Sequence, residues 1–244
     1  MKRVNDIICV FRIHLARLRA EAGPFLLAAF IFPSAMYLFT SAISGAAEQQ
    51  TRLRFLAGSI VFSLSLTAIS WLGYLLLENR FTGRLKLFAT LPLAPSSYVF
   101  GILTFGVIQA SLGTSMLLVV TRLMGVRTQL SLAPLAATIL LTMLCLCGLA
   151  VIIASCARSF SEGSLLTDSL GAGLVLVAPV YYSPAAMPRA LRVVAEWLPT
   201  AFAARAVQTS LAGGHLIASD LAALGLMAVV TLSLGFRLMK WREE

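Results

Sequence analysis

The sequence predicts an all-α integral membrane protein with six transmembrane helices. Three observations lead to this fold class. Hydrophobic residues make up 59% of the 244 residues and charged residues only 12%, with a mean hydropathy of +0.91, whereas about a quarter of the residues of a soluble domain are charged. The apolar residues fall into runs of about 20, the length of a helix that crosses a bilayer. No change in composition marks off a soluble part, so residues 1–244 are expected to form a single transmembrane domain.

Residues 1–22 are predicted to form an amphipathic helix that lies in the plane of the membrane interface. Basic residues lie mostly off a stripe of apolar residues that recur at helical spacing. The residues of this stripe are Val4, Ile7, Ile8, Phe11, Leu15 and Leu18. The alternative is an ordinary basic flank that only orients the first span.

The six predicted spans are residues 24–44, 56–77, 97–120, 132–154, 165–182 and 221–238. An even number of spans places both termini on one side. With the termini inside, twelve of the 19 Lys and Arg residues lie on the inner side, namely Lys2, Arg3, Arg12, Arg17, Arg19, Arg80, Arg84, Lys86, Arg158, Arg237, Lys240 and Arg242. Because cytoplasmic loops carry the excess of basic residues, we expect a multi-pass protein of the bacterial inner membrane with both termini in the cytoplasm.

Residues 78–96 then form the first cytoplasmic loop. This loop is basic and partly apolar, and Pro92 and Pro95 end the short helix that it contains. A helix of two turns is not stable alone in water. It therefore needs a surface to lie on, either the bilayer interface or a partner protein.

Residues 183–215, between the fifth and sixth spans, are predicted to form short re-entrant helices on the outer side. Pro184, Pro188 and Pro199 divide the segment into pieces that are shorter than a membrane helix. Such pieces fit best when they dip into the outer leaflet against protein. The alternative is a surface loop with an amphipathic helix.

Polar residues inside the spans are candidates for a substrate path. In the second span they recur at a spacing that places them on one α-helical face. They are Ser59, Ser63, Thr67, Ser70 and Tyr74. Gln109 is the most polar residue near the middle of a span. Small polar residues also allow membrane helices to pack closely, which is the alternative role for this stripe.

The residue inventory argues against an enzyme. Only three lysines occur, and none follows a glycine, so the phosphate-binding sequence G-x-x-x-x-G-K-[ST] is absent. The two histidines lie in different segments, which argues against an acid–base pair or a metalloprotease. We expect no metal or other cofactor in this chain. The basic residues occur singly rather than in clusters with aromatic residues, which favours membrane lipid over nucleic acid as a partner.

Two runs of residues carry a resemblance to a known family. The first run, in the first cytoplasmic loop, consists of Glu78, Gly83, Leu85, Leu87, Thr90, Pro92 and Gly101. The second consists of Pro184, Pro188, Leu191, Pro199, Thr200, Arg205, Leu211, Gly213 and Gly214. In their order and placement these runs resemble the permease subunits of type-2 ATP-binding-cassette (ABC-2) transporters, most of which are exporters.

The resemblance implies a division of labour between chains. Residues 78–96 would hold a coupling helix that docks on a separate ATPase subunit through Glu78, Arg80, Gly83, Arg84, Leu85, Lys86, Leu87 and Phe88. Residues 183–215 would form an outer gate that includes Pro184, Pro188, Pro199 and Arg205. The expected partners are two ATPase subunits, which bind ATP and Mg²⁺, and a second copy of this permease or a related one. The alternatives are a secondary transporter and a membrane assembly factor without transport.

Overall fold

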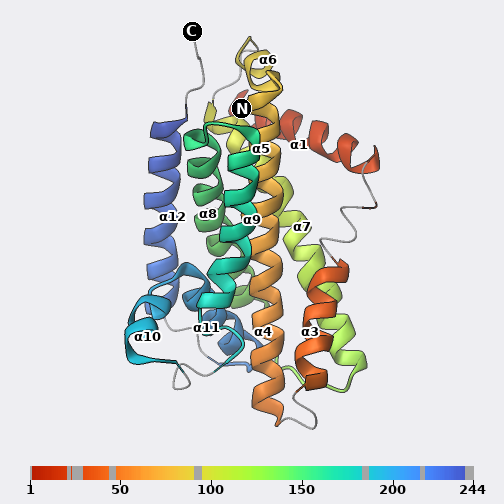
Figure 1. The fold of residues 1–244 in the computed structure, drawn as a ribbon. Coiled ribbons are helices and arrows are strands. Elements are labelled where there is room, and N and C mark those ends of the chain that lie inside the picture. Colours follow the sequence, from red (N-terminus) through yellow and green to blue (C-terminus); the bar gives the residue numbers. More distant parts are fainter. Residues whose placement is uncertain are drawn as a thin grey trace.

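The computed structural model describes residues 2–20, 23, 30–43, 48–90, 95–182, 187–214 and 218–239. Within these residues the regular secondary structure is helical throughout (Figure 1). The elements are α1 (Lys2–Ala20), α3 (Phe32–Ile43), α4 (Gln49–Ser65), the π-helix η2 (Leu66–Trp71), α5 (Leu72–Phe81), α6 (Arg84–Thr90), α7 (Pro95–Leu123), α8 (Leu132–Cys156), α9 (Phe160–Val177), α10 (Arg189–Glu196), α11 (Pro199–Leu211) and α12 (Ala218–Leu238).

Four helices in the described part of the chain are long and apolar enough to cross a membrane. They are Gln49–Phe81, which joins α4, η2 and α5, and then Ser96–Leu123, Leu132–Cys156 and Ala218–Leu238. These helices correspond to the second, third, fourth and sixth predicted spans. Lipid offers no hydrogen bonds to the backbone, so a long apolar segment is stable there only as a continuous helix or a closed barrel.

The first and fifth predicted spans correspond to shorter helices. α3 covers the second half of residues 24–44, of which residues 24–29 lie outside the described part of the chain. α9 begins five residues before the predicted start at 165 because a cap forms there. The Ser159 hydroxyl accepts a hydrogen bond from the Glu162 N–H (3.1 Å), and the Glu162 carboxylate accepts one from the Arg158 N–H (3.0 Å). This arrangement resembles a capping box, which sets a helix N-terminus.

α8 lies at the centre of the bundle and packs most closely against α12. A side chain at Gly148 would place its Cβ only 2.4 Å from Thr231 Oγ1 and 2.8 Å from the Leu232 backbone nitrogen. The Thr231 hydroxyl donates a hydrogen bond to the Cys145 carbonyl (3.0 Å) across the same interface. A small residue and a hydroxyl therefore bring these two helices together, as is usual between membrane helices.

The two ends of the bundle carry different elements (Figure 1). α1, α6 and the C-terminal end of α12 lie at one end, and α10 and α11 lie at the other. α1 runs across the bundle rather than along it. Its Val10 and His14 are buried, and the rings of Phe11 and His14 pack against Phe105 of α7. Ile8 and Leu15, which belong to the predicted apolar stripe, remain exposed. α1 therefore has one face on α7 and an apolar face that no described part of the chain covers.

Candidate functional site

The short helix predicted after the second span is present as α6, and a tight turn joins it to α5. Residues 78–90, which contain this turn and α6, are termed the elbow. The Thr82 hydroxyl donates to the Glu78 carbonyl (2.6 Å) at the end of α5. Gly83 then takes a φ of +78°, a left-handed conformation that glycine adopts without the penalty of a side chain. The chain turns at Gly83, and α6 starts at Arg84.

Arg80 fastens the elbow to the C-terminal end of α8. Its Nη1 lies 2.7 Å from the carbonyl oxygen of Ala154, 3.1 Å from that of Ser155 and 2.9 Å from that of Ala157. These carbonyls have no partner within an α-helix and carry the negative end of the helix dipole. The guanidinium also lies over the Phe81 ring, 5.1 Å from its centroid. Arg80 thus donates hydrogen bonds to carbonyl groups at the end of α8, which lies far away in sequence.

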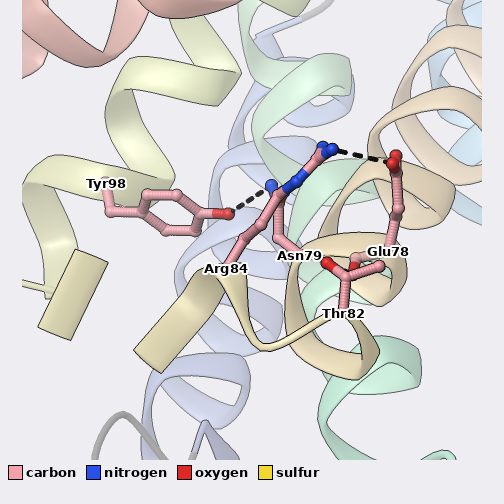
Figure 2. A network of polar contacts seen from close by, with 5 residues as sticks. All are labelled: Glu78, Asn79, Thr82, Arg84 and Tyr98. Carbon is pink, nitrogen blue, oxygen red and sulfur yellow. Dashed lines mark hydrogen bonds and ion pairs between the residues drawn. The ribbon is translucent and has the colours of Figure 1, made fainter. Parts of the chain in front are cut away.

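A second attachment joins the elbow to α7 through Tyr98. The Asn79 amide donates to the buried Tyr98 hydroxyl (2.8 Å), as Figure 2 shows. The Phe88 ring of α6 packs on the same tyrosine, with its centroid 5.1 Å from that of Tyr98. Leu85, one turn before Phe88, also packs against the core. One face of α6 is therefore held by the bundle.

The opposite face of α6 is open. Leu87 has 65% of its surface exposed, more than Phe81, Leu85 or Phe88 in the elbow. Lys86 is exposed beside it. Arg84 Nη1 lies 3.2 Å from Glu78 Oε1 (Figure 2), and the Arg84 side chain is more than half exposed. The exposed side chain of Leu87 therefore lies on α6 together with two cationic residues, Arg84 and Lys86, at one end of the bundle.

The structure divides the predicted ATPase-contact residues into three sets. The residues that hold the elbow to the bundle are Arg80, Leu85 and Phe88. The residues that form its open surface are Arg84, Lys86 and Leu87. Glu78 and Gly83 shape the turn. Sequence reasoning missed Asn79 and Tyr98, although a polar amide two residues after the end of an apolar span was a signal for Asn79.

The polar residues of the second span do not share one environment. Ser59, Ser63 and Thr67 are buried, whereas Tyr74 is 45% exposed and packs edge-to-face on Phe160 with centroids 5.2 Å apart. Ser70 lies on η2. A π-helix uses i→i+5 hydrogen bonds and so rotates the residues that follow it relative to those before it. The spacing that predicted a single α-helical face therefore does not hold across η2.

Two roles can be told apart within this polar set. The Ser70 hydroxyl donates to the Thr167 carbonyl of α9 (3.4 Å), which is a helix-packing contact. The Ser59 hydroxyl faces the Tyr181 side chain. The Ser63 hydroxyl and the Gln109 amide are buried, and among the described residues they find no hydrogen-bond partner. A buried polar group without a partner costs about 1–3 kcal/mol. Ser63 and Gln109 remain the better candidates for lining a path.

Two of the predicted gate prolines start the helices at the other end of the bundle. Pro188 immediately precedes α10. Pro199 is the first residue of α11, where its fixed φ suits the helix and its missing N–H loses no bond. The Thr200 hydroxyl donates to the Leu174 carbonyl (2.7 Å) and so joins α11 to α9. The third proline, Pro184, lies outside the described residues.

Arg205, the remaining predicted gate residue, forms a bidentate ion pair with Asp220. Its Nη2 lies 2.8 Å from Oδ1 and its Nε lies 3.3 Å from Oδ2. The Arg205 side chain is 42% exposed, whereas that of Asp220 is only 6% exposed. The guanidinium also lies over the Phe202 ring at 4.6 Å. This pair ties α11 to the first turn of α12.

Arg205→Ala is expected to lower the free energy of unfolding by about 1–2 kcal/mol. Removing one member of a fully buried pair costs about 3–5 kcal/mol, but the exposure of Arg205 screens this pair. Thermal unfolding in detergent measures the change. Arg205→Ala combined with Asp220→Asn should recover part of the loss, because no buried charge is then left alone. Arg189→Ala, at an exposed arginine of α10, is the matched control, and an equal loss there would contradict the prediction.

Comparison with known families agrees with the resemblance noted in the sequence. The family model described as ABC-2 type transporter matches residues 7–211. The match runs from α1 to the end of α11 and includes the elbow and Arg205. A search of curated proteins finds no match. Since the family match covers most of a helical chain with several apolar membrane-length helices, the chain belongs to the ABC-2 type transporter family, as a multi-pass membrane permease subunit.

Proposed function

We propose that this chain is the transmembrane permease subunit of an ATP-driven exporter. It alternates between inward-facing and outward-facing arrangements, and separate ATPase subunits supply the energy. The observation that carries the proposal is the elbow, in which α6 packs one face on α7 through Phe88 and exposes Leu87 and Lys86 on the other, while Arg80 of the preceding turn holds α5 to α8. An apolar side chain held out beside a cation is suited to anchor a partner protein.

The proposed topology has six spans, with α3 and α9 as parts of the first and fifth. The whole chain, residues 1–244, is then one transmembrane domain, and α1 lies in the membrane interface. α1, α6 and the end of α12 share one end of the bundle (Figure 1), which supports a topology with both termini and the elbow in the cytoplasm, at a bacterial inner membrane. α10 and α11 form the re-entrant outer gate on the opposite side.

The chemistry of the elbow suggests what its partner surface provides. Leu87 suits an apolar pocket, and Lys86 suits carboxylates beside that pocket, whereas Arg84 already pairs with Glu78. We propose that each of two ATPase subunits, with ATP and Mg²⁺ bound, offers such a groove to one permease. The second permease is another copy of this chain or a related one.

Purification of the tagged chain from its native membrane in mild detergent tests this function. A soluble ATPase subunit with a phosphate-binding loop is expected to co-purify with the chain. Proteoliposomes that contain both components should transport only with ATP. If the chain purified alone sustained transport in proteoliposomes, driven by an ion gradient, the proposed function would be wrong.

A further inference from the structure

The second span is not one uniform α-helix. The π-helix η2 (Leu66–Trp71) lies between α4 and α5 in the continuous helix Gln49–Phe81. At the end of η2 the Leu72 N–H donates to the carbonyls of Thr67 and Ile69, five and three residues earlier, whereas an α-helical N–H donates to the carbonyl four residues earlier. A π-helical turn holds one residue more than an α-helical turn and is often found at a functional site. The span therefore carries one residue in excess of a regular α-helix near its middle.

α9 packs against η2 and the start of α5 through small residues. A Cβ added at Gly171 of α9 would lie 2.5 Å from the Ser70 hydroxyl oxygen, and one added at Gly73 of α5 would lie 2.6 Å from Thr167 Cγ2. Both distances are shorter than van der Waals contact, so a larger side chain at either glycine must displace its neighbour. Small residues let membrane helices approach this closely. The contact between α9 and the second span therefore depends on which residues of the span face α9.

Two serine hydroxyls attach the span to α9, and they do so unequally. On the α4 side of η2, the Ser65 hydroxyl donates to the Gly171 carbonyl (2.7 Å) in a buried hydrogen bond. On the α5 side, the Ser70 hydroxyl donates to the Thr167 carbonyl at 3.4 Å, which is long for a hydrogen bond. The span is therefore held more firmly before η2 than after it.

This asymmetry leaves the extra residue of η2 a route toward α5. If the wide turn moved one turn along the span, each residue that it passed would take the place of the next, with a rotation of about 100° and a shift of about 1.5 Å. The i→i+5 hydrogen bonds given up at one end would be replaced by α-helical ones. Leu72 would then take the place of Gly73 against Thr167, where a single added carbon already lies 2.6 Å away. A leucine does not fit there, so the start of α5 and α9 would separate.

We propose that η2 is a two-position switch between the second span and α9. With the wide turn at Leu66–Trp71, α5 and α9 are in contact, and with the turn moved toward the elbow they are apart. Packed helices change between discrete arrangements of this kind rather than deforming continuously. The inference rests on the proposed function, for which it supplies two arrangements of the bundle. The 10 residues of α5 connect η2 to the elbow, so a load on the elbow reaches the switch along one helix.

Hydrogen–deuterium exchange of the full chain in lipid nanodiscs tests the switch without transport. In the wild type, the amides of residues 66–72 are expected to exchange about tenfold faster than those of residues 56–61, because their hydrogen bonds alternate between two patterns. Gly73→Ala should raise the rate in residues 66–72 about fivefold further, since the added methyl displaces Thr167 and favours the separated position. Gly173→Ala is the matched control on α9, because no described atom lies within 4 Å of its added methyl. Exchange in residues 66–72 as slow as in residues 56–61, or equal effects of the two alanines, would overturn the proposal.

A deletion tests whether transport uses the switch. Deletion of Ser70 removes the extra residue, so the span can close as a regular α-helix with its two flanks in place. This variant is expected to retain the co-purifying ATPase but to lose ATP-driven transport about tenfold or more, because one of the two positions is no longer available. Ser70→Ala removes only the hydroxyl and should still transport.

Helical content and the thermal midpoint report whether the deletion variant is folded, and the exchange experiment decides the proposal if it is not. Transport at the wild-type rate by the folded deletion variant would overturn the switch. A wild-type protein that neither binds an ATPase nor transports with ATP would instead contradict the proposed function. The two failures are distinguishable, because hydrogen exchange is measured on this chain alone.

Discussion

Leu87→Asp is expected to abolish ATP-driven transport while the protein remains folded in the membrane. Leu87 is 65% exposed, and it does not take part in the Phe88–Tyr98 contact that attaches α6 to the bundle. Loss of a central apolar anchor from an interface costs about 2 kcal/mol or more, which is about a 30-fold loss of affinity. A carboxylate placed among the proposed carboxylates of the partner adds repulsion. The measurements are the ATPase activity of the reconstituted complex and the amount of ATPase that co-purifies.

Two further variants sharpen this experiment. Leu87→Met keeps an apolar side chain of similar volume and should remain active. Leu123→Asp makes the same change at an exposed leucine at the end of α7, away from the elbow, and should leave ATPase binding intact. Wild-type coupling in Leu87→Asp, or equal losses in Leu87→Asp and Leu123→Asp, would show that the open face of α6 is not the contact.

Charged substitutions at Leu85 and Phe88 are a less specific test, although both residues belong to the predicted contact. Both side chains pack on the bundle, Phe88 directly on Tyr98. A charge there would be buried without a partner and would detach α6. Loss of transport in such a variant would therefore report the position of the elbow rather than its docking surface.

Arg80→Gln is expected to lower the free energy of unfolding by about 2–4 kcal/mol. The guanidinium is within hydrogen-bond distance of three carbonyls at the end of α8, and a hydrogen bond to a charged group contributes about 1.5–3 kcal/mol. Glutamine is too short to reach them and carries no charge to oppose the helix dipole. Thermal or detergent-induced unfolding measures the loss, and Arg80→Lys should recover part of it.

The matched control for this prediction is Arg84→Gln. It removes the same charge four residues later, where the arginine is more than half exposed and pairs only with Glu78 among the described contacts. A surface pair of this kind contributes about 0–1 kcal/mol. Losses of the same size in Arg80→Gln and Arg84→Gln would show that the carbonyls of α8 do not depend on Arg80.

Hydropathy predicted the long helices well because a long apolar segment in lipid must satisfy its backbone hydrogen bonds internally, which a continuous helix does. α8 begins at Leu132, as expected, and ends two residues past the expected end at 154. The second span extends further at both ends and contains η2. A π-helical turn leaves no mark on an apolar pattern, so the rotation that it causes could not be anticipated. The early start of α9 was visible in principle, as Ser159 followed by Glu162.

The place of the elbow followed from local chemistry, whereas its orientation depended on distant residues. Gly83 and the prolines after α6 mark a turn and a stop in any context. On a helix, Leu85 and Phe88 share a face that Leu87 does not. Which face turns inward depends on Tyr98, and the partner of Arg80 is the end of α8, 74 residues along the chain. Contacts at such separation leave no periodic signal in the sequence.

The double attachment of the elbow restricts how it can move. The last turn of α5 is fixed to α7 through Asn79 and to α8 through Arg80. Beyond the turn at Gly83, α6 is held by the Phe88 ring, which packs on Tyr98 of α7. A push on Leu87 therefore reaches the start of α7 directly through Phe88, and it reaches the end of α8 only through the turn and Arg80. α12 would follow α8, because the close contact between Gly148 and Thr231 leaves no room for these two helices to approach further.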